Sequence, residues 1–194
     1  MARKARTNLP EAQDASAADR LAPIRTERLE LVLLSPELLR AILEGEPAAG
    51  LEIPAGWPDE HDRRFLQLRL DQVTKDPGRL EWLPRAIVLR KRGRPVIGHI
   101  GFHGPPGVNG PRKPNALEVG YTVFEPFRRR GYATEAVSAV LAWAREAYEI
   151  HHFVASVSPD NVPSLALVRR FGFRRTGRQW DDEDGEELVF ELHL

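Results

Sequence analysis

The sequence predicts one α/β (α+β) domain with a mixed sheet, and three observations support this fold class. A chain of 194 residues is long enough to bury a proper core within a single domain. Its apolar content of 42% and charged content of 29% are ordinary for a globular protein. Strand-like segments come first, helical segments then alternate with strands, and no linker divides the chain.

Hydrophobic periodicity and capping residues give the elements in order. Alternating leucines predict a strand over residues 27–34, after which Ser35 and Pro36 start a short helix. A loop rich in proline and glycine follows over residues 45–58. The other strands are expected over residues 82–90, 95–102, 116–124, 152–157, 173–178 and 188–194. The other helices are expected over residues 59–75, 134–148 and 161–171.

The first 22 residues are expected to form a flexible tail, and the domain is expected to span residues 23–194. The segment 1–20 mixes arginine, alanine and acidic residues without the apolar core of a signal peptide. No apolar run approaches the roughly 20 residues that cross a bilayer. The chain has no cysteine, which excludes disulfides and thiolate ligands and fits a cytoplasmic protein.

The charge balance disfavours polyanionic partners. Because 28 basic residues balance 28 acidic ones, no bulk field attracts nucleic acid or an anionic membrane. Charge is uneven only locally, with arginine-rich segments at 128–130 and 169–178 and an acidic segment at 181–187. We therefore expect no nucleic-acid or membrane partner. A nucleic-acid-binding module built on the arginines is the alternative that salt-dependent binding would reveal.

The most informative segment joins a strand to a helix through a basic turn. After Phe124 and a proline, the arginines 128–130 lead through Gly131 into a helix. A helix start offers unpaired N–H groups and a partial positive charge, and Gly131 and Ala133 let the backbone approach an anion closely. The segment predicts a pyrophosphate site, and the alternative is a solvated basic turn that only starts a helix. No Walker-type or dinucleotide motif competes with it.

The motif Arg128-x-x-Gly131-x-Ala133 resembles the [RQ]-x-x-G-x-[GA] signature of GNAT acyltransferases, which wraps the pyrophosphate of acetyl-CoA. The surrounding motifs also resemble that family at its usual distances, and they are Glu118-Val-Gly-Tyr121, Asn161-x-x-Ser164 and Gly172-Phe173. The opening Thr26-Glu-Arg-Leu29 resembles the Rim-type branch, which acetylates the N-termini of ribosomal proteins. The resemblance covers roughly residues 24–194.

The resemblance implies a mostly antiparallel sheet of about seven strands with helices on both faces and a splayed central strand pair. Acetyl-CoA is the implied co-substrate, with its pantetheine arm lying between the splayed strands as in strand addition. The residues implied to bind it are Tyr121, Thr122 and Val123 through backbone groups, and Arg128, Arg129, Arg130, Gly131, Ala133, Thr134, Asn161 and Ser164.

Amine acetylation needs a group that takes the proton of the amine and a group that stabilises the departing thiolate. Without cysteine or a G-x-S-x-G motif, direct attack of the amine in a ternary complex is simpler than a covalent acyl-enzyme. The resemblance makes Glu118 the candidate water-linked base, and Ser164 the candidate acid because Val168 occupies the family's tyrosine position. For Glu118 the alternative is a surface carboxylate or a structural hydrogen-bond partner, and for Asn161 it is a helix cap.

The acceptor implied by the resemblance is a primary amine, on a protein N-terminus or a small molecule, used by a monomer or homodimer. A non-catalytic acyl-CoA-binding regulator and transfer of a different acyl group are the alternatives. His99, His103 and the pair 151–152 are interpreted as packing residues, and no metal site is expected. His103 alternatively lines the acceptor site.

Overall fold

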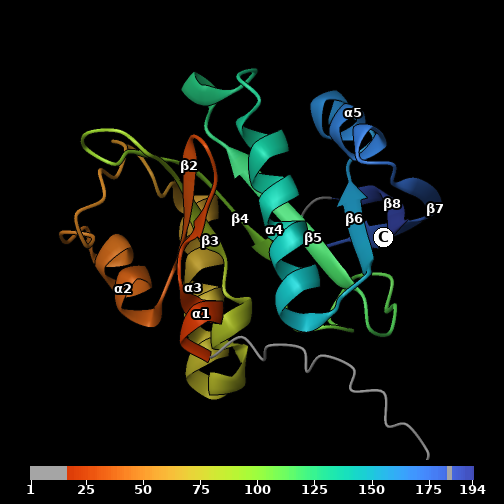
Figure 1. The fold of residues 1–194 in the computed structure, drawn as a ribbon, viewed down its shortest axis with the longest axis horizontal. Helices are drawn as coiled ribbons and strands as arrows, with labels where there is room; N and C mark the ends of the chain where they lie inside the picture. Colours follow the sequence, from red (N-terminus) through yellow and green to blue (C-terminus); the bar gives the residue numbers. More distant parts are fainter. Residues whose placement is uncertain (1–16, 183–184) are drawn as a thin grey trace, which may run out of the picture.

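The structure, a computed structural model, describes residues 17–182 and 185–194. The strands of this part form one sheet in the order β1-β2-β3-β4-β5-β6-β8-β7, and only the neighbours β5 and β6 are parallel (Figure 1). The strands are β1 (Ile24–Arg25), β2 (Leu29–Leu33), β3 (Arg85–Leu89), β4 (Val96–Phe102), β5 (Leu117–Val123), β6 (His152–Val157), β7 (Arg174–Asp181) and β8 (Gly185–His193). Eight strands replace the expected seven or so because the two-residue β1 adds an edge to the sheet.

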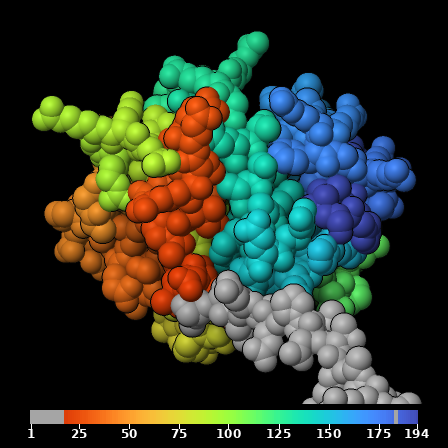
Figure 2. All heavy atoms as spheres, in the orientation of Figure 1, coloured from red at the N-terminus to blue at the C-terminus, as the bar shows by residue number. Residues whose placement is uncertain are grey.

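Helices cover both faces of the sheet, as expected. The α-helices are α1 (Ala17–Leu21), α2 (Pro36–Glu44), α3 (Glu60–Lys75), α4 (Tyr132–Tyr148) and α5 (Val162–Arg170), and the 3₁₀ helices are η1 (Pro77–Trp82) and η2 (Glu125–Phe127). The side chains of α4 and α5 pack in one core cluster, and those of α2 and α3 in a second one on the other face. In Figure 2, α4 lies between β2 and α5 on the face toward the viewer. Among the described residues, no helix is long and apolar enough to span a bilayer.

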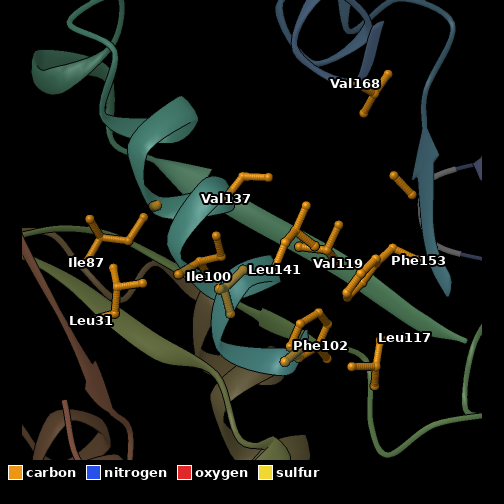
Figure 3. Close-up of a cluster of buried hydrophobic side chains, with 14 of the residues drawn as sticks. Leu31, Ile87, Ile100, Phe102, Leu117, Val119, Val137, Leu141, Phe153 and Val168 are labelled. Carbon is orange, nitrogen blue, oxygen red and sulfur yellow. The ribbon is translucent and has the colours of Figure 1, made fainter. Parts of the chain in front are cut away.

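The larger core lies between α4 and the sheet. Val137 and Leu141, one turn apart on α4, are at most 3% exposed and face the strands. Figure 3 shows them over Ile100 and Phe102 of β4, with the core continuing to Phe153 of β6. This packing fixes α4 across β4 and β5, and so fixes where the helix begins relative to the ends of these strands.

Three predicted helix starts are confirmed, and each depends on a short-range capping bond. Ser35 accepts a hydrogen bond from the amide of Leu38 at the start of α2. Asp59 caps α3 and Asn161 caps α5 through the same spacing of three residues. Because such caps involve only neighbouring residues, the sequence is sufficient to locate them.

The largest boundary differences lie at one strand and one turn. The strand expected over residues 82–90 begins only at Arg85, because the proline at 84 has no N–H for the ladder and residues 77–82 form η1. The expected acidic turn over residues 181–187 is shorter, because β7 continues to Asp181 and β8 begins at Gly185. Residues 183 and 184 of that turn lie outside the described residues.

The segment expected to be a tail includes a helix, α1, over residues 17–21. The buried Arg85, 2% exposed, holds the end of this segment. Its guanidinium donates to the carbonyls of Arg20 (2.7 Å) and Ala22 (2.8 Å), and also to that of Leu31 (3.4 Å). Burial lowers the pKa of Arg85 to about 10, which leaves it charged at neutral pH. Residues 1–16 of the expected tail lie outside the described part.

Candidate active site

The parallel strands β5 and β6 separate soon after they begin. They face each other only where Leu117 pairs with Phe153 and Glu118 pairs with Val154. Beyond these pairs β5 runs on to Val123, while β6 continues to pair with β8. Figure 1 shows the two arrows diverging, with the start of α4 and the helix α5 at the open end. The sheet therefore has the splayed central strand pair that the sequence predicts.

Two hydrogen bonds determine which backbone groups of β5 face this gap. The His103 amide donates to the Glu118 carbonyl (3.0 Å), and the Phe124 amide donates to the Ile97 carbonyl (2.8 Å). Bonded positions recur at every second residue of an antiparallel ladder, so Thr122 also directs its N–H and C=O to β4. The intervening residues, whose backbone groups point into the gap, are Val119, Tyr121 and Val123.

The ladder thus separates the three residues expected to bind a pantetheine arm through the backbone. The backbone groups of Tyr121 and Val123 face the gap, whereas those of Thr122, which lies opposite His99, face β4. The carbonyl of Val123 accepts a hydrogen bond from Nε of Arg128 (2.8 Å). The first arginine of the basic turn is therefore folded back against the end of β5.

The turn before α4 presents backbone amides. Gly131 is the N-cap in the left-handed conformation (φ +81°), and no side chain caps the helix. The first amide to bond back is that of Glu135, to the Gly131 carbonyl (3.1 Å), so the amides of residues 132–134 have no partner within the helix. The arginines 128–130 are exposed beside them. Free amides, a positive helix end and guanidinium groups together suit a diphosphate.

Arg28, from the opening motif of the predicted domain, braces this turn. Its Nε and Nη2 each lie 2.6 Å from one oxygen of Glu135, and its Nη1 donates to the Arg130 carbonyl (3.0 Å). Its guanidinium also lies 4.7 Å from the centre of the Tyr132 ring. Thr26 donates to the other oxygen of Glu135 (2.5 Å). Burial raises the pKa of Glu135, but these bonds lower it below its usual range, so the carboxylate stays ionised.

A hydrogen bond between side chains of β5 and α5 spans the gap. Asn161 caps the helix by accepting a hydrogen bond from the Ser164 amide (3.2 Å), which is the helix-cap role given above as its alternative. The hydroxyl of Tyr121 reaches from β5 and donates to Oγ of Ser164 (3.0 Å). Burial raises the pKa of Tyr121, and the bond to Ser164 offsets only part of that rise. Val168, at the position where the family carries tyrosine, is 2% exposed and belongs to the core.

Glu118 is buried at the point where the strands separate. Its side chain is 1% exposed. One oxygen accepts from the Ser156 hydroxyl, and the other accepts from the Gly110 amide (2.6 Å) and lies 3.4 Å from Nδ1 of His103. Burial raises the pKa of Glu118, but the His103 ring and the bonds from Ser156 and Gly110 outweigh this and hold it below its usual range. The carboxylate is therefore ionised at neutral pH.

A cleft of about 560 Å³ opens on the face of the sheet opposite α4 and α5. Gly101 and Gly120 face each other across β4 and β5 and form its floor, and Phe65 and Arg69 of α3 form one wall. A second carboxylate–histidine pair lies here, with Asp62 of α3 at 3.5 Å from His99. Burial raises the pKa of Asp62, but His99 beside it brings the value below its usual range. The cleft therefore contains ionisable groups next to the gap.

A family model described as an acetyltransferase (GNAT) domain matches residues 28–174, three quarters of the chain. The chain belongs to the GNAT acetyltransferase family. The family uses acetyl-CoA as its co-substrate, and the chain is accordingly an acyl-CoA-dependent acetyltransferase that acts on an amine.

Known GNAT proteins resemble this chain over most of its length. The uncharacterized N-acetyltransferase YjdG of Bacillus subtilis is 25% identical over 154 residues, which are 77% of this chain and 88% of YjdG. A structure described as a GnaT-family acetyltransferase from Bordetella pertussis has 26% identity and a TM-score of 0.66, covering 88% of this chain and 98% of that one. The ribosomal L7/L12 acetyltransferase RimL, solved with coenzyme A, has the same fold at 18% identity, with a TM-score of 0.60 and coverage of 89% and 98%.

Several site residues of this GNAT acetyltransferase have no role, or only an alternative role, in the sequence prediction. Only the backbone of Tyr121 has a role in that prediction, and Asp62 carries no motif. Arg28 lay within a recognised motif but had no assigned role. His103 was only an alternative lining residue, although its spacing of four from His99 already placed both rings on one face of a strand.

One cluster of metal-ligand type lies away from the gap, at the closed end of β6. Ligand atoms of His152, Glu191 and His193 lie within 4.8 Å of one another. His152 is 2.8 Å from one carboxylate oxygen of Glu191, and Lys113 is 2.9 Å from the other. Burial raises the pKa of Glu191, but Lys113, Thr176 and His152 bring it to about 2. These contacts describe an ion-paired cluster outside the candidate active site.

Proposed function

We propose that this GNAT acetyltransferase moves the acetyl group of acetyl-CoA to a primary amine, on a protein N-terminus or a small molecule, by direct attack in a ternary complex. The observation that supports this most is the gap between β5 and β6, which lies between a helix start with unpaired amides and a cleft lined by Asp62, His99 and His103. A cytoplasmic location, expected from the sequence, belongs to the same proposal.

The diphosphate of acetyl-CoA is assigned to the turn before α4. Backbone amides of Gly131, Ala133 and Thr134 and the exposed side chains of Arg129 and Arg130 supply donors and positive charge. The pantetheine arm is assigned to the gap, where backbone groups of Tyr121 and Val123 lack a partner strand. Arg128 lies at the junction, where its Nε already donates to one lone pair of the Val123 carbonyl.

The thioester sulfur is assigned to the neighbourhood of Ser164. Because Oγ of Ser164 accepts a hydrogen bond from the Tyr121 hydroxyl, the hydroxyl proton of Ser164 itself is free to donate to a departing thiolate. Asn161 supports this group by capping the first turn of α5. With no cysteine in the chain, a ternary complex avoids the need for a covalent acyl intermediate.

The acceptor amine is assigned to the cleft on the α3 face. In this assignment the amine approaches the thioester carbon from that face, while the acetyl donor lies in the gap between β5 and β6. In this arrangement the enzyme gains rate mainly by holding the two reactants together. The cleft contains both acidic and basic side chains, which fits a cationic amine on a polar molecule such as a peptide.

Calorimetry with acetyl-CoA, followed by a mass-spectrometric screen of amines and N-terminal peptides, tests the proposal. Initial rates that give intersecting double-reciprocal lines are expected for a ternary complex. Parallel lines, or an acetylated enzyme formed without acceptor, would contradict direct attack. Tight binding of acetyl-CoA without turnover of any amine would instead identify a regulator, and no binding at millimolar acetyl-CoA would sink the proposal.

A further inference from the structure

Glu118 is too enclosed to act on an amine directly. Both of its oxygens are occupied, one by the Ser156 hydroxyl and the other by the Gly110 amide (2.6 Å). Ser156 is itself held by Nε2 of Gln179 (3.1 Å). Among the described residues, the neighbour that connects this buried carboxylate to the cleft is the ring of His103.

His103 lies between the carboxylate and the cleft, and its position is fixed. Its side chain is 47% exposed, in contrast to the 1% of Glu118. Its amide donates to the Glu118 carbonyl (3.0 Å), and its own carbonyl accepts from Nη1 of Arg69 (2.7 Å). Its Nε2 lies over the floor of the cleft, because a Cβ placed on Gly120 would be 3.1 Å from that atom.

The carboxylate also selects the tautomer of this ring. Nδ1 of His103 lies 3.4 Å from Oε2 of Glu118, so a proton on Nδ1 faces a negative charge. A histidine that keeps its proton on Nδ1 has a free lone pair on Nε2. The geometry therefore presents Nε2 of the ring to the cleft, with the ring oriented by a group that does not itself reach the cleft.

We propose that His103 takes the proton of the acceptor amine through Nε2, and that Glu118 is the positioning residue that orients its ring. The proposal rests on the acetyl transfer proposed above. One proton of the ammonium passes to Nε2 and is then released to solvent. The lone pair of the neutral nitrogen forms the C–N bond, and the C–S bond breaks with its electrons on sulfur. A second proton from nitrogen ends on the thiol.

Charged and titratable groups from several elements lie beside this histidine or around the cleft that it lines. They are Glu118 of β5, Arg69, His61, Asp62 and Arg64 of α3, Arg79 of η1, His99 of β4 and Asp181 of β7. Glu118 lies beside the ring itself, and its negative charge stabilises the imidazolium that proton transfer creates. On the acid limb of the rate profile, Nε2 already carries a proton and cannot accept another. Because the negative charge of Glu118 favours the protonated ring, removing that charge moves the acid limb to lower pH.

Two small acceptors at pH 7 separate this role from binding. Ethylamine is protonated and must lose a proton, whereas hydroxylamine is neutral and need not. With the uncatalysed rate subtracted, His103→Gln is expected to slow ethylamine acetylation about 10²-fold and hydroxylamine acetylation less than about 3-fold. His151→Gln, an exposed histidine beyond the closed end of β6, is the matched control and keeps both rates. Unchanged ethylamine rates in His103→Gln, or equal losses with both acceptors, overturn the proposal.

Glu118→Gln distinguishes a positioning residue from the base itself. A positioning role predicts a lower kcat, an almost unchanged KM and an acid limb displaced to lower pH. If Glu118 were the base, the acid limb would disappear from the profile of this variant.

Nitrogen-15 NMR of the histidine-labelled wild-type protein tests the tautomer without turnover. A proton on Nδ1 of His103 is expected, and a proton on Nε2 at neutral pH overturns the inference even if no acceptor is known. Absence of acetyl-CoA binding in calorimetry, by contrast, would remove the proposed function and leave this tautomer result standing.

Discussion

Replacing Gly131 with alanine perturbs the turn before α4 without adding charge. Gly131 has φ +81°, a left-handed conformation that costs a residue with a Cβ about 1–2 kcal/mol. The new Cβ would lie 3.4 Å from Nη2 of Arg28, so the bracing side chain would also have to yield slightly. The variant either accepts this strain or rotates the turn to relieve it. We expect it to lose about 1–2 kcal/mol of unfolding free energy in the first case.

Rotation of the turn would withdraw the amides of residues 132–134 from a bound diphosphate. One hydrogen bond to a charged group contributes about 1.5–3 kcal/mol. Because each 1.4 kcal/mol is about tenfold in Kd, the loss of one such bond predicts acetyl-CoA binding that is about 10- to 100-fold weaker. Isothermal titration calorimetry measures this directly, and urea denaturation measures the accompanying change in stability.

The matched control is Gly45→Ala at the end of α2. Gly45 has nearly the same left-handed backbone (φ +73°), and no atom lies within 4 Å of its Cβ position. Both variants are expected to lose similar stability, but only Gly131→Ala should lose affinity for acetyl-CoA. Equal affinity in Gly131→Ala and the wild type, or an equal loss in both variants, would refute the placement of the diphosphate at this turn.

Two further predictions concern the thiolate end of the gap and the anchored N-terminal segment. Ser164→Ala should slow acetyl transfer on the order of 10²-fold, and the penalty should shrink with an acetyl thioester of a more acidic thiol. A penalty that is independent of the leaving thiol would contradict the role of Ser164. Arg85→Met leaves three carbonyls without their donor and should lower the free energy of unfolding by at least about 3 kcal/mol in urea denaturation. A change below about 1 kcal/mol would mean that water replaces these bonds.

The parts of the fold that the sequence predicts correctly depend on local chemistry. The caps Ser35 and Asn161 act over three residues, so the sequence locates their helices from neighbouring positions, and it locates the helix after Asp59 from its apolar spacing. The apolar face of α4 was visible in its own spacing, although the helix begins two residues before the expected start because Gly131 serves as its cap. Binding of acetyl-CoA, in contrast, was predicted through the family resemblance, since the basic turn alone also fits a solvated helix start.

The features that the sequence did not give depend on register between strands. The phase of the β4–β5 ladder decides that Thr122 turns its backbone away from the gap, and that phase follows from tertiary pairing. The same pairing brings His103 opposite Glu118, fifteen positions further along the chain, and makes a coupled pair of two residues that no sequence motif connects. The bracing role of Arg28 likewise needs the packing of α4 beside the first strands.

The two faces of the sheet carry different side chains near the gap, and two glycines leave the backbone between them uncovered on the cleft side. Side chains alternate along β5, so Tyr121 extends toward Ser164 on the α5 side while Glu118 and Gly120 belong to the cleft side. A Cβ on Gly120 would press on the His103 ring, and a Cβ on the facing Gly101 would come within 2.7 Å of the Pro84 backbone. The absence of these side chains keeps the cleft open down to the backbone. In the function proposed above, an amine in the cleft therefore reaches a thioester in the gap without crossing a layer of side chains.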